Sequence, residues 1–197
     1  MDQSVRRFQS LASICKAITD GDVSEANRLI ALQGPDGFEG DAADRIGESP
    51  VMLALSTGHP RLARRLVAAG YRPDLWESAA LDMASELHRI AVSASDRIDI
   101  CNAEGWAAIH LACYAHAYDA LGVLCEFAAD PNTVACNSAL ETPLHAAVRV
   151  DDPRLIETLL AAGADPRFTD AAGRAPIQLA IELASVEAAG VLVSIES

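Results

Sequence analysis

Short stretches of apolar residues with helical spacing recur along this chain, and turn-forming residues separate them. Near the N-terminus, the apolar positions follow the spacing of a helix with one buried face: Val5, Phe8, Leu11, Ile14, Cys15 and Ile18. Turn formers at residues 20–22 follow, and residues 23–32 show a second apolar helix pattern. The same order of apolar helix, tight turn and apolar helix returns along the rest of the chain. This pattern predicts an all-α protein built from pairs of short helices.

The predicted helix pairs share a six-residue motif at the start of their first helix. Residues 142–147 read Thr-Pro-Leu-His-Ala-Ala, and residues 175–180, which begin 33 positions later, read Ala-Pro-Ile-Gln-Leu-Ala. Related copies lie at residues 107–112 and 49–54. Twenty-two residues after the first position of the motif, three of the copies reach a similar second segment, at Ala164, Tyr71 and Ala129. The chain is therefore predicted to be an array of related units.

Proline and glycine indicate where the helices of a unit begin and end. Proline costs little at the first position of a helix, where its missing N–H would have no partner, and a preceding Thr or Ser can cap the helix. We therefore expect helices to start at Pro143 and at Pro50. Gly70 and Gly163 stand where a helix must end in a left-handed residue. One such unit cannot bury its apolar face alone, so its stability comes from neighbouring units.

In its unit length and in the motif of residues 142–147, the chain resembles the ankyrin-repeat family, whose unit of about 33 residues contains a turn and two helices. The resemblance implies a single domain over residues 1–197 that forms an all-α ankyrin-repeat solenoid of about six helix-turn-helix units. The first and last units are expected to act as caps. We expect the units at residues 3–33, 45–74, 75–98, 102–132, 138–167 and 171–197.

The third unit is degenerate. Asp82 stands where the family usually has histidine, and no glycine closes the second helix. We expect the helices of this unit near residues 77–86 and 89–94. Between the first and second units, residues 33–49 are rich in turn formers, which predicts an extended finger there.

Charge and composition narrow the classes of partner. The net charge of −13 disfavours nucleic-acid binding, because phosphate repels an acidic surface, and it favours a protein partner with a basic patch. No apolar run approaches the roughly 20 residues that span a membrane, and we expect no secretory signal, so we predict a cytoplasmic location. Lys16 is the single lysine among 15 basic residues, which suggests a GC-rich, bacterial gene.

The sequence has no pattern typical of an enzyme, a cofactor site or a metal site. No glycine-rich phosphate loop and no Gly-x-Ser-x-Gly motif occurs. His110 and His145 occupy the same position of their units, and the resemblance implies that their imidazoles bond the turn backbone. The cysteines are odd in number and contain no Cys-x-x-Cys pair, so we expect free, buried thiols and no disulfide framework: Cys15, Cys101, Cys113, Cys125 and Cys136.

The ankyrin resemblance implies that the turn fingers and the first helices line a concave surface that binds other proteins. We expect residues just before each motif, and residues seven positions after its start, to face that surface. The two tryptophans are the strongest candidates because tryptophan is enriched in binding hot spots; the alternative is that they fill the irregular interface of the third unit. The candidate contact residues are Trp76, Trp106, Arg45, Glu48, Glu104, Tyr114, Glu141, Arg149 and Arg174.

The predicted function is a non-enzymatic interaction module or adaptor that acts as a monomer and needs no cofactor. One alternative is an acidic inhibitor, such as an immunity or antitoxin-like protein that neutralises a basic toxin or nuclease. Another alternative is a bacterial effector that is delivered into a host cell.

Overall fold

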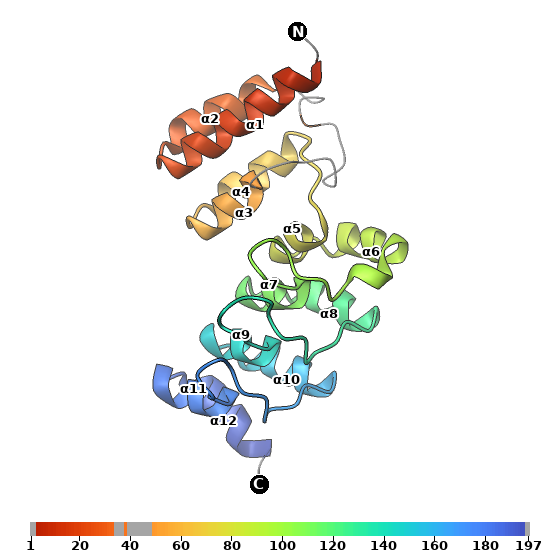
Figure 1. Ribbon diagram of the computed structural model, residues 1–197, viewed down its shortest axis with the longest axis vertical. Helices are drawn as coiled ribbons and strands as arrows, with labels where there is room; N and C mark the ends of the chain where they lie inside the picture. The colour runs from red at the N-terminus through yellow and green to blue at the C-terminus, as the bar shows by residue number, and fades with distance from the viewer. Residues whose placement is uncertain (1–2, 34–37, 39–48, 196–197) are drawn as a thin grey trace. The chain divides into compact units, whose positions relative to one another are not determined.

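The computed structural model describes residues 3–33, 38 and 49–195 of the 197 residues. In this described part the protein contains twelve α-helices, a short 3-10 helix and no strand (Figure 1), which confirms the all-α fold class. The chain divides into two compact units, Met1–Glu77 and Ser78–Ser197. Arg45, Glu48 and almost all of the predicted finger lie outside the described residues. One continuous domain over residues 1–197 stays a prediction.

The first compact unit contains two complete helix pairs. Helices α1 (Gln3–Thr19) and α2 (Val23–Leu32) form the first pair, and α3 (Pro50–Ser56) and α4 (Pro60–Ala68) form the second. α1 packs against α2 and α3, and α4 packs against the same two helices. Because each helix turns an apolar stripe toward its neighbours, the core of this unit consists of buried aliphatic side chains, among them Ile14, Ile18, Ile30, Leu62 and Leu66.

The second compact unit contains a longer stack of helices. α5 (Leu75–Ala80) begins in the first unit and ends in the second. α6 (Ala84–Ser93) and the 3-10 turn η2 (Ser95–Arg97) come next. Three helix pairs follow: α7 (Ala108–Tyr114) with α8 (Tyr118–Glu126), α9 (Pro143–Arg149) with α10 (Pro153–Ala161), and α11 (Pro176–Leu183) with α12 (Val186–Ile195). The first helices α7, α9 and α11 pack side by side in chain order, while α6 packs on α8 and α10 on α12. The starts predicted at Pro50 and Pro143 are confirmed.

A residue with positive φ stands in each of the turns that join the two helices of a pair in the described part of the chain. These residues are Gly21, Gly58, Asp82, His116, Asp151 and Ala184. Glycine adopts this conformation at the lowest cost, and aspartate tolerates it because its short polar side chain makes local hydrogen bonds. The backbone geometry of the turn therefore recurs from pair to pair although the residue type does not.

The helix boundaries predicted for the third unit are wrong. α5 ends at Ala80, and a turn precedes α6, so the helix expected over residues 77–86 is interrupted. Asp82 lies in that turn with φ of 56°, in the place that Gly58 has in the preceding pair, and is not the counterpart of a histidine. Its carboxylate accepts the backbone N–H of Ala120 at 2.8 Å, which satisfies a donor in the first turn of α8. Periodicity failed here because an alanine-rich sequence favours an unbroken helix, whereas one left-handed residue makes the turn.

The third unit is shortened at its entrance, where residues 69–74 connect α4 directly with α5. Asp74 and Glu77 cap α5 reciprocally: each side chain accepts the other residue's backbone N–H at 2.8 Å. Glu77 is buried and also accepts the Tyr71 hydroxyl at 2.6 Å and the Ser49 hydroxyl. Every donor here comes from the first compact unit, so this buried carboxylate ties the start of α5 to the second helix pair.

Candidate functional site

Three connecting loops of the second compact unit carry four of the nine predicted contact residues: Glu104, Trp106, Glu141 and Arg174. We call them finger 1 (residues 98–107), finger 2 (residues 127–142) and finger 3 (residues 162–175), and they lead into α7, α9 and α11 respectively. The backbone N–H of Cys136 donates to Gly105 O at 2.8 Å, and that of Ala171 donates to Ala139 O at 2.9 Å. These bonds join each finger to the next, so the residues at their ends are presented side by side.

Trp106, the last residue of finger 1 before the N-cap of α7, is half-buried. Both its backbone and its ring make contacts that fix its position. Its backbone N–H donates to Asn102 Oδ1 at 2.9 Å. Its indole ring lies edge-on to the Tyr114 ring, with 5.2 Å between centroids, and 5.6 Å from the His110 ring. Tyr114 itself is half-buried at the end of α7. The two aromatic side chains therefore form an ordered pair that is still partly accessible to a partner.

Glu141 lies behind this pair with only 2% of its surface exposed. Its carboxylate accepts the Tyr114 hydroxyl at 2.7 Å and Arg149 Nε at 2.8 Å, with a further contact from Arg149 Nη2. Burial opposes ionisation of Glu141, but the hydrogen bonds from Arg149 and Tyr114 outweigh it and lower the pKa of the carboxyl. Burial, together with the same carboxylate, raises the pKa of Tyr114. Glu141 thus orients Tyr114 and Arg149 rather than offering a surface of its own.

Arg174 occupies the corresponding position at the end of finger 3. Its guanidinium donates to Asp170 Oδ2 at 2.6 and 2.9 Å and to Glu182 at 2.8 Å. Burial opposes ionisation of Asp170, yet the bonds from Arg174 keep the pKa of that carboxyl below its usual value. Both arginines of the site are therefore already neutralised by carboxylates of this chain.

The two motif histidines lock finger 2 onto α7 and finger 3 onto α9, as the resemblance implied. His110 Nε2 lies 2.9 Å from Glu141 O, and His145 Nε2 lies 2.9 Å from Arg174 O. Because a carbonyl oxygen can only accept, both Nε2 atoms must carry the proton. In His145 the other nitrogen, Nδ1, then accepts the backbone N–H of Thr142 at 3.2 Å and its hydroxyl at 2.9 Å. This prediction from the sequence is confirmed.

These histidines predict a loss of stability in mild acid. Burial lowers the pKa of both His110 and His145, so the unfolded chain takes up protons at a higher pH than the folded protein does. Stability is then complete above the unfolded value of about 6.5 and falls below it, by up to about 1 kcal/mol for each histidine between pH 6.5 and 5.5. Urea unfolding at a series of pH values measures this loss. In His145→Gln, which copies the natural Gln178 of the next unit, the pH dependence should be about half as steep, and an unchanged slope would contradict the assignment.

The remaining predicted contact residues are not all brought together. Glu104 is exposed on finger 1, where its carbonyl accepts Asn137 Nδ2 at 3.4 Å. Trp76 is half-buried in α5, in the first compact unit. The residues that the structure does bring together form the inner-face cluster, which consists of Trp106, Tyr114, Glu141, Arg149 and Arg174.

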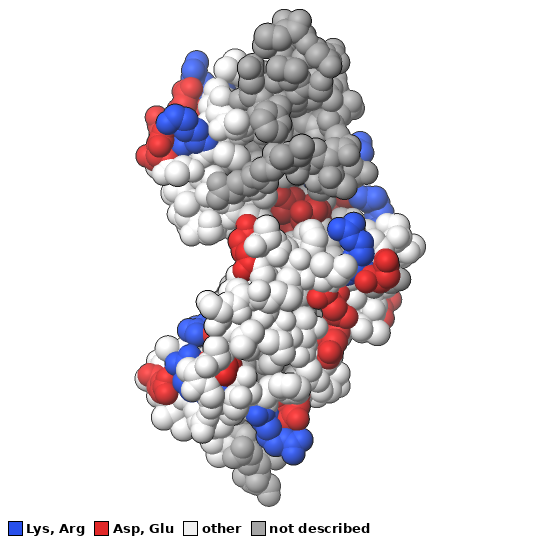
Figure 2. Space-filling model, in the orientation of Figure 1, with Lys and Arg blue, Asp and Glu red and all other residues white. Residues whose placement is uncertain are grey.

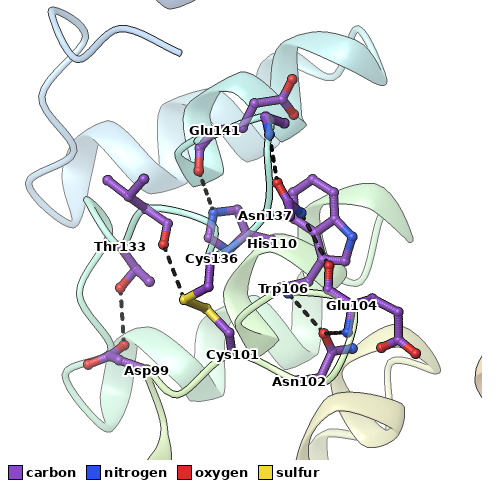
Figure 3. The surroundings of a disulfide bond; sticks show 12 residues. Asp99, Cys101, Asn102, Glu104, Trp106, His110, Thr133, Cys136, Asn137 and Glu141 are labelled. Atoms are coloured by element: carbon purple, nitrogen blue, oxygen red, sulfur yellow. Dashed lines mark hydrogen bonds between the residues drawn. A yellow bond between two sulfur atoms is a disulfide. The ribbon is translucent and has the colours of Figure 1, made fainter. Parts of the chain in front are cut away.

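A disulfide links Cys101 of finger 1 with Cys136 of finger 2, with 6.3 Å between their Cα atoms (Figure 3). The prediction of free thiols is wrong for these two residues, whereas Cys113 is free and buried as expected. The missed signal is positional: each of the two cysteines stands six residues before the N-cap of the helix that follows, at Ala107 and Thr142. Equivalent positions in stacked neighbours lie one repeat spacing apart, and adjacent fingers bring them within disulfide range.

No metal centre is evident in the described residues. No group of three or more His, Cys, Asp or Glu side chains among them could hold a metal ion. A surface cavity of about 490 Å³ in the first unit is lined partly by Asn27, His59, Arg61 and Arg65, and by no carboxylate or cysteine. No described helix combines the length and the apolar character that crossing a membrane requires.

Repeated helix pairs, recurring left-handed turns and the histidine lock define a protein of stacked helical repeats. Residues 79–170 match the family model described as ankyrin repeats in three copies, and the chain belongs to the ankyrin-repeat family. Human B-cell lymphoma 3 protein is 31% identical over 170 residues, which cover 84% of this chain and 32% of the relative.

Two further relatives match shorter or less similar stretches. Human NF-kappa-B inhibitor alpha is 43% identical over 56 residues, which cover 28% of this chain and 18% of the relative. A putative ankyrin repeat protein of Fowlpox virus is 28% identical over 152 residues, or 77% of this chain and 28% of the relative. The chain thus spans at most 32% of the length of these three relatives.

Proposed function

We propose that this chain is a non-enzymatic protein-binding module that grips a protein partner with the inner-face cluster of its second compact unit. The observation that carries the proposal is the ordered, partly accessible pair of Trp106 and Tyr114, in which the Tyr114 hydroxyl donates to the buried Glu141 carboxylate. Preorganised aromatic side chains are the residues that dominate binding energy in protein interfaces. Trp76, Arg45, Glu48 and Glu104 remain proposed contacts.

Charge supports a partner with basic residues around an apolar centre. The second compact unit, Ser78–Ser197, carries 17 acidic and 6 basic side chains, a net charge of −11, out of −13 for the whole chain. Arg149 and Arg174 are paired within the chain, so they offer an acidic partner little free charge. Figure 2 shows a broad uncharged area over the connecting loops of this unit, and these loops carry the exposed apolar side chains Ile100, Val134, Leu140 and Phe168.

The proposal includes a monomer that acts in the cytoplasm and binds neither nucleic acid nor membrane. Repulsion between phosphate and a surface of this charge supports the exclusion of nucleic acid. A bacterial origin stays a prediction, since the relatives described above come from human and from a poxvirus.

Affinity capture from the native organism tests the proposal. Trp106→Ala should reduce capture of the partner at least about tenfold, because hot-spot tryptophans commonly contribute about 2 kcal/mol or more. Phe127→Ala is the matched control: Phe127 is also half-buried and packs edge-on against a histidine ring, that of His88 in α6 at 5.0 Å, but it lies where α8 ends and is not part of the inner-face cluster. Equal capture by both folded variants would refute the inner-face assignment.

An acidic inhibitor of a basic protein is the second candidate. The net charge of −11 on the second unit favours it, and one relative is named as an inhibitor of a protein. An adaptor would leave the activity of the captured protein unchanged, whereas an inhibitor would abolish it at a one-to-one ratio. Titration of the captured protein's own activity with this chain separates the two candidates.

A further inference from the structure

The disulfide occupies an accessible place at the edge of the inner-face cluster. Cys136 is exposed and Cys101 is half-buried, so we expect a small thiol to reach Cys136 without unfolding the unit. Figure 3 shows the bond between finger 1 and finger 2, on the same fingers that carry Trp106 and Glu141. Exposed disulfides of this kind are the exchangeable ones, whereas buried disulfides resist reduction.

Few other side-chain contacts hold the two fingers together. Besides the backbone bond from Cys136 N–H to Gly105 O, the contacts are Asp130 N–H to Asp99 Oδ1 at 2.9 Å, Asn137 Nδ2 to Glu104 O at 3.4 Å and Thr133 Oγ1 to Asp99 Oδ1 at 3.5 Å. The last two are at the long end of hydrogen-bond geometry. The next finger pair keeps a similar backbone bond, from Ala171 N–H to Ala139 O at 2.9 Å, with no disulfide between its fingers. Opening the disulfide should therefore leave the fold intact and make fingers 1 and 2 more mobile.

The disulfide is one residue away from the group that positions the tryptophan. Asn102 follows Cys101, and its Oδ1 accepts the backbone N–H of Trp106 at 2.9 Å and that of Glu104 at 3.1 Å. On the other side, Asn137 follows Cys136 and holds its own turn by accepting the Ala139 N–H at 3.0 Å. Asn102 thus connects the backbone beside Cys101 with the backbone that presents Trp106.

We propose that Cys101–Cys136 is an exchangeable disulfide, a site at which a dithiol reductant acts on the folded protein, and that its opening loosens the fingers beside Trp106. One thiolate of the reductant attacks Cys136 Sγ, the bond between the two protein sulfurs breaks, and Cys101 leaves as a thiolate that takes up a proton. The second thiol of the reductant then displaces Cys136 from the mixed disulfide. Two electrons pass from the dithiol to the protein, and the products are a reductant disulfide and two protein thiols.

The consequence for binding rests on the proposed function. A cross-linked finger pair presents Trp106 in one arrangement, and a reduced pair must be ordered when a partner binds. We expect reduction to weaken partner capture about three- to tenfold, as loss of preorganisation does. In a reducing compartment the open, weaker form would predominate, and in an oxidising one the cross-linked form would.

The experiment uses the full chain as Trp76→Phe, in which Trp106 is the single remaining tryptophan. Dithiothreitol is added to the folded protein, thiols are counted by alkylation, and Trp106 emission and hydrogen exchange of the fingers are recorded. The expected result is a gain of two alkylated thiols without loss of helix signal, together with a shift of Trp106 emission and faster exchange in fingers 1 and 2. The double variant Cys101→Ser with Cys136→Ser should show the Trp106 emission of the reduced protein before any dithiothreitol is added. Addition of the reductant should not change that emission. Cys125→Ser, which removes a thiol outside the disulfide, should behave like the parent.

Two outcomes would overturn the proposal. One is a disulfide that reacts with dithiothreitol only under conditions that unfold the chain, and the other is a fully reduced, folded chain with unchanged Trp106 emission and finger exchange. Both readouts are independent of any partner, so they hold even if the inner face binds nothing. Capture of the protein partner from the native organism, compared with and without dithiothreitol, then tests the expected three- to tenfold weakening of binding. Equal capture in both states would refute only the effect of the disulfide on binding.

Discussion

Gly105→Ala should lower the free energy of unfolding of the second compact unit by about 3 kcal/mol. Gly105 has φ of +82°, where a residue with a Cβ is strained by about 1 kcal/mol. A Cβ built there would lie 2.8 Å from Asn137 Cβ and from Asn137 N, and 2.9 Å from the carbonyl carbon of Cys136. Two of these three atoms belong to the backbone of finger 2, which is held by its bond to Gly105 and cannot move away without loss of that bond.

Gly173→Ala is the control for this variant. Gly173 occupies the same place in finger 3, two residues before the N-cap of the following helix, and has φ of +76°. A Cβ there would meet no atom within 4 Å, so only the backbone strain remains, and we expect a loss of about 1 kcal/mol. Urea denaturation followed by circular dichroism measures both values. If the two variants lost the same stability, the close approach of fingers 1 and 2 would not exist as described.

Glu141→Ala should cost about 2 to 3 kcal/mol of stability. The substitution leaves the Tyr114 hydroxyl and the Arg149 guanidinium without their acceptor. Removing one partner of a fully buried ion pair costs about 3 to 5 kcal/mol, but the Arg149 side chain is 35% exposed, and water will compensate part of the loss. Glu182→Ala breaks a comparable contact to Arg174 at a side chain that is 55% exposed, and should cost less than about 1 kcal/mol.

Glu141 should also make the free energy of unfolding depend on pH in acid. Because the pKa of Glu141 is lower in the folded protein, its contribution is complete above the unfolded value of about 4.5 and is lost as the pH falls through the folded pKa. Glu141→Gln keeps the shape and an acceptor oxygen but does not titrate. Its unfolding free energy should therefore depend less on pH below about 4.5 than that of the parent chain. Parallel pH profiles of parent and variant, measured by urea unfolding, would contradict this role of Glu141.

The candidate site shows what a repeat pattern can and cannot predict. The positions of Trp106, Glu141 and Arg174 before their helices follow from motif spacing alone, because every first helix enters the stack in the same way. Motif spacing could not show which of these three residues is buried and which is partly exposed. Glu141 is buried because Tyr114, 27 residues earlier, and Arg149, 8 residues later, converge on its carboxylate. Such convergence depends on how neighbouring repeats pack and leaves no periodic signal.

By itself, the sequence determined the class of fold and the helix starts at Pro50 and Pro143, because these depend on local chemistry that each repeat carries within its own residues. The histidine lock joins neighbouring repeats, and it was predictable because the family resemblance implies it at a repeated position. Only the tertiary structure decided that Asp82 makes a turn, that Cys101 and Cys136 are joined, and that Glu141 lies inside. Each of these features depends on an atom from another repeat: the Ala120 N–H, a second sulfur, or a tyrosine hydroxyl. Contacts between repeats form only when the stack brings together residues that are about 30 to 40 positions apart in the sequence. Helical periodicity does not predict these contacts because it reports on a single helix.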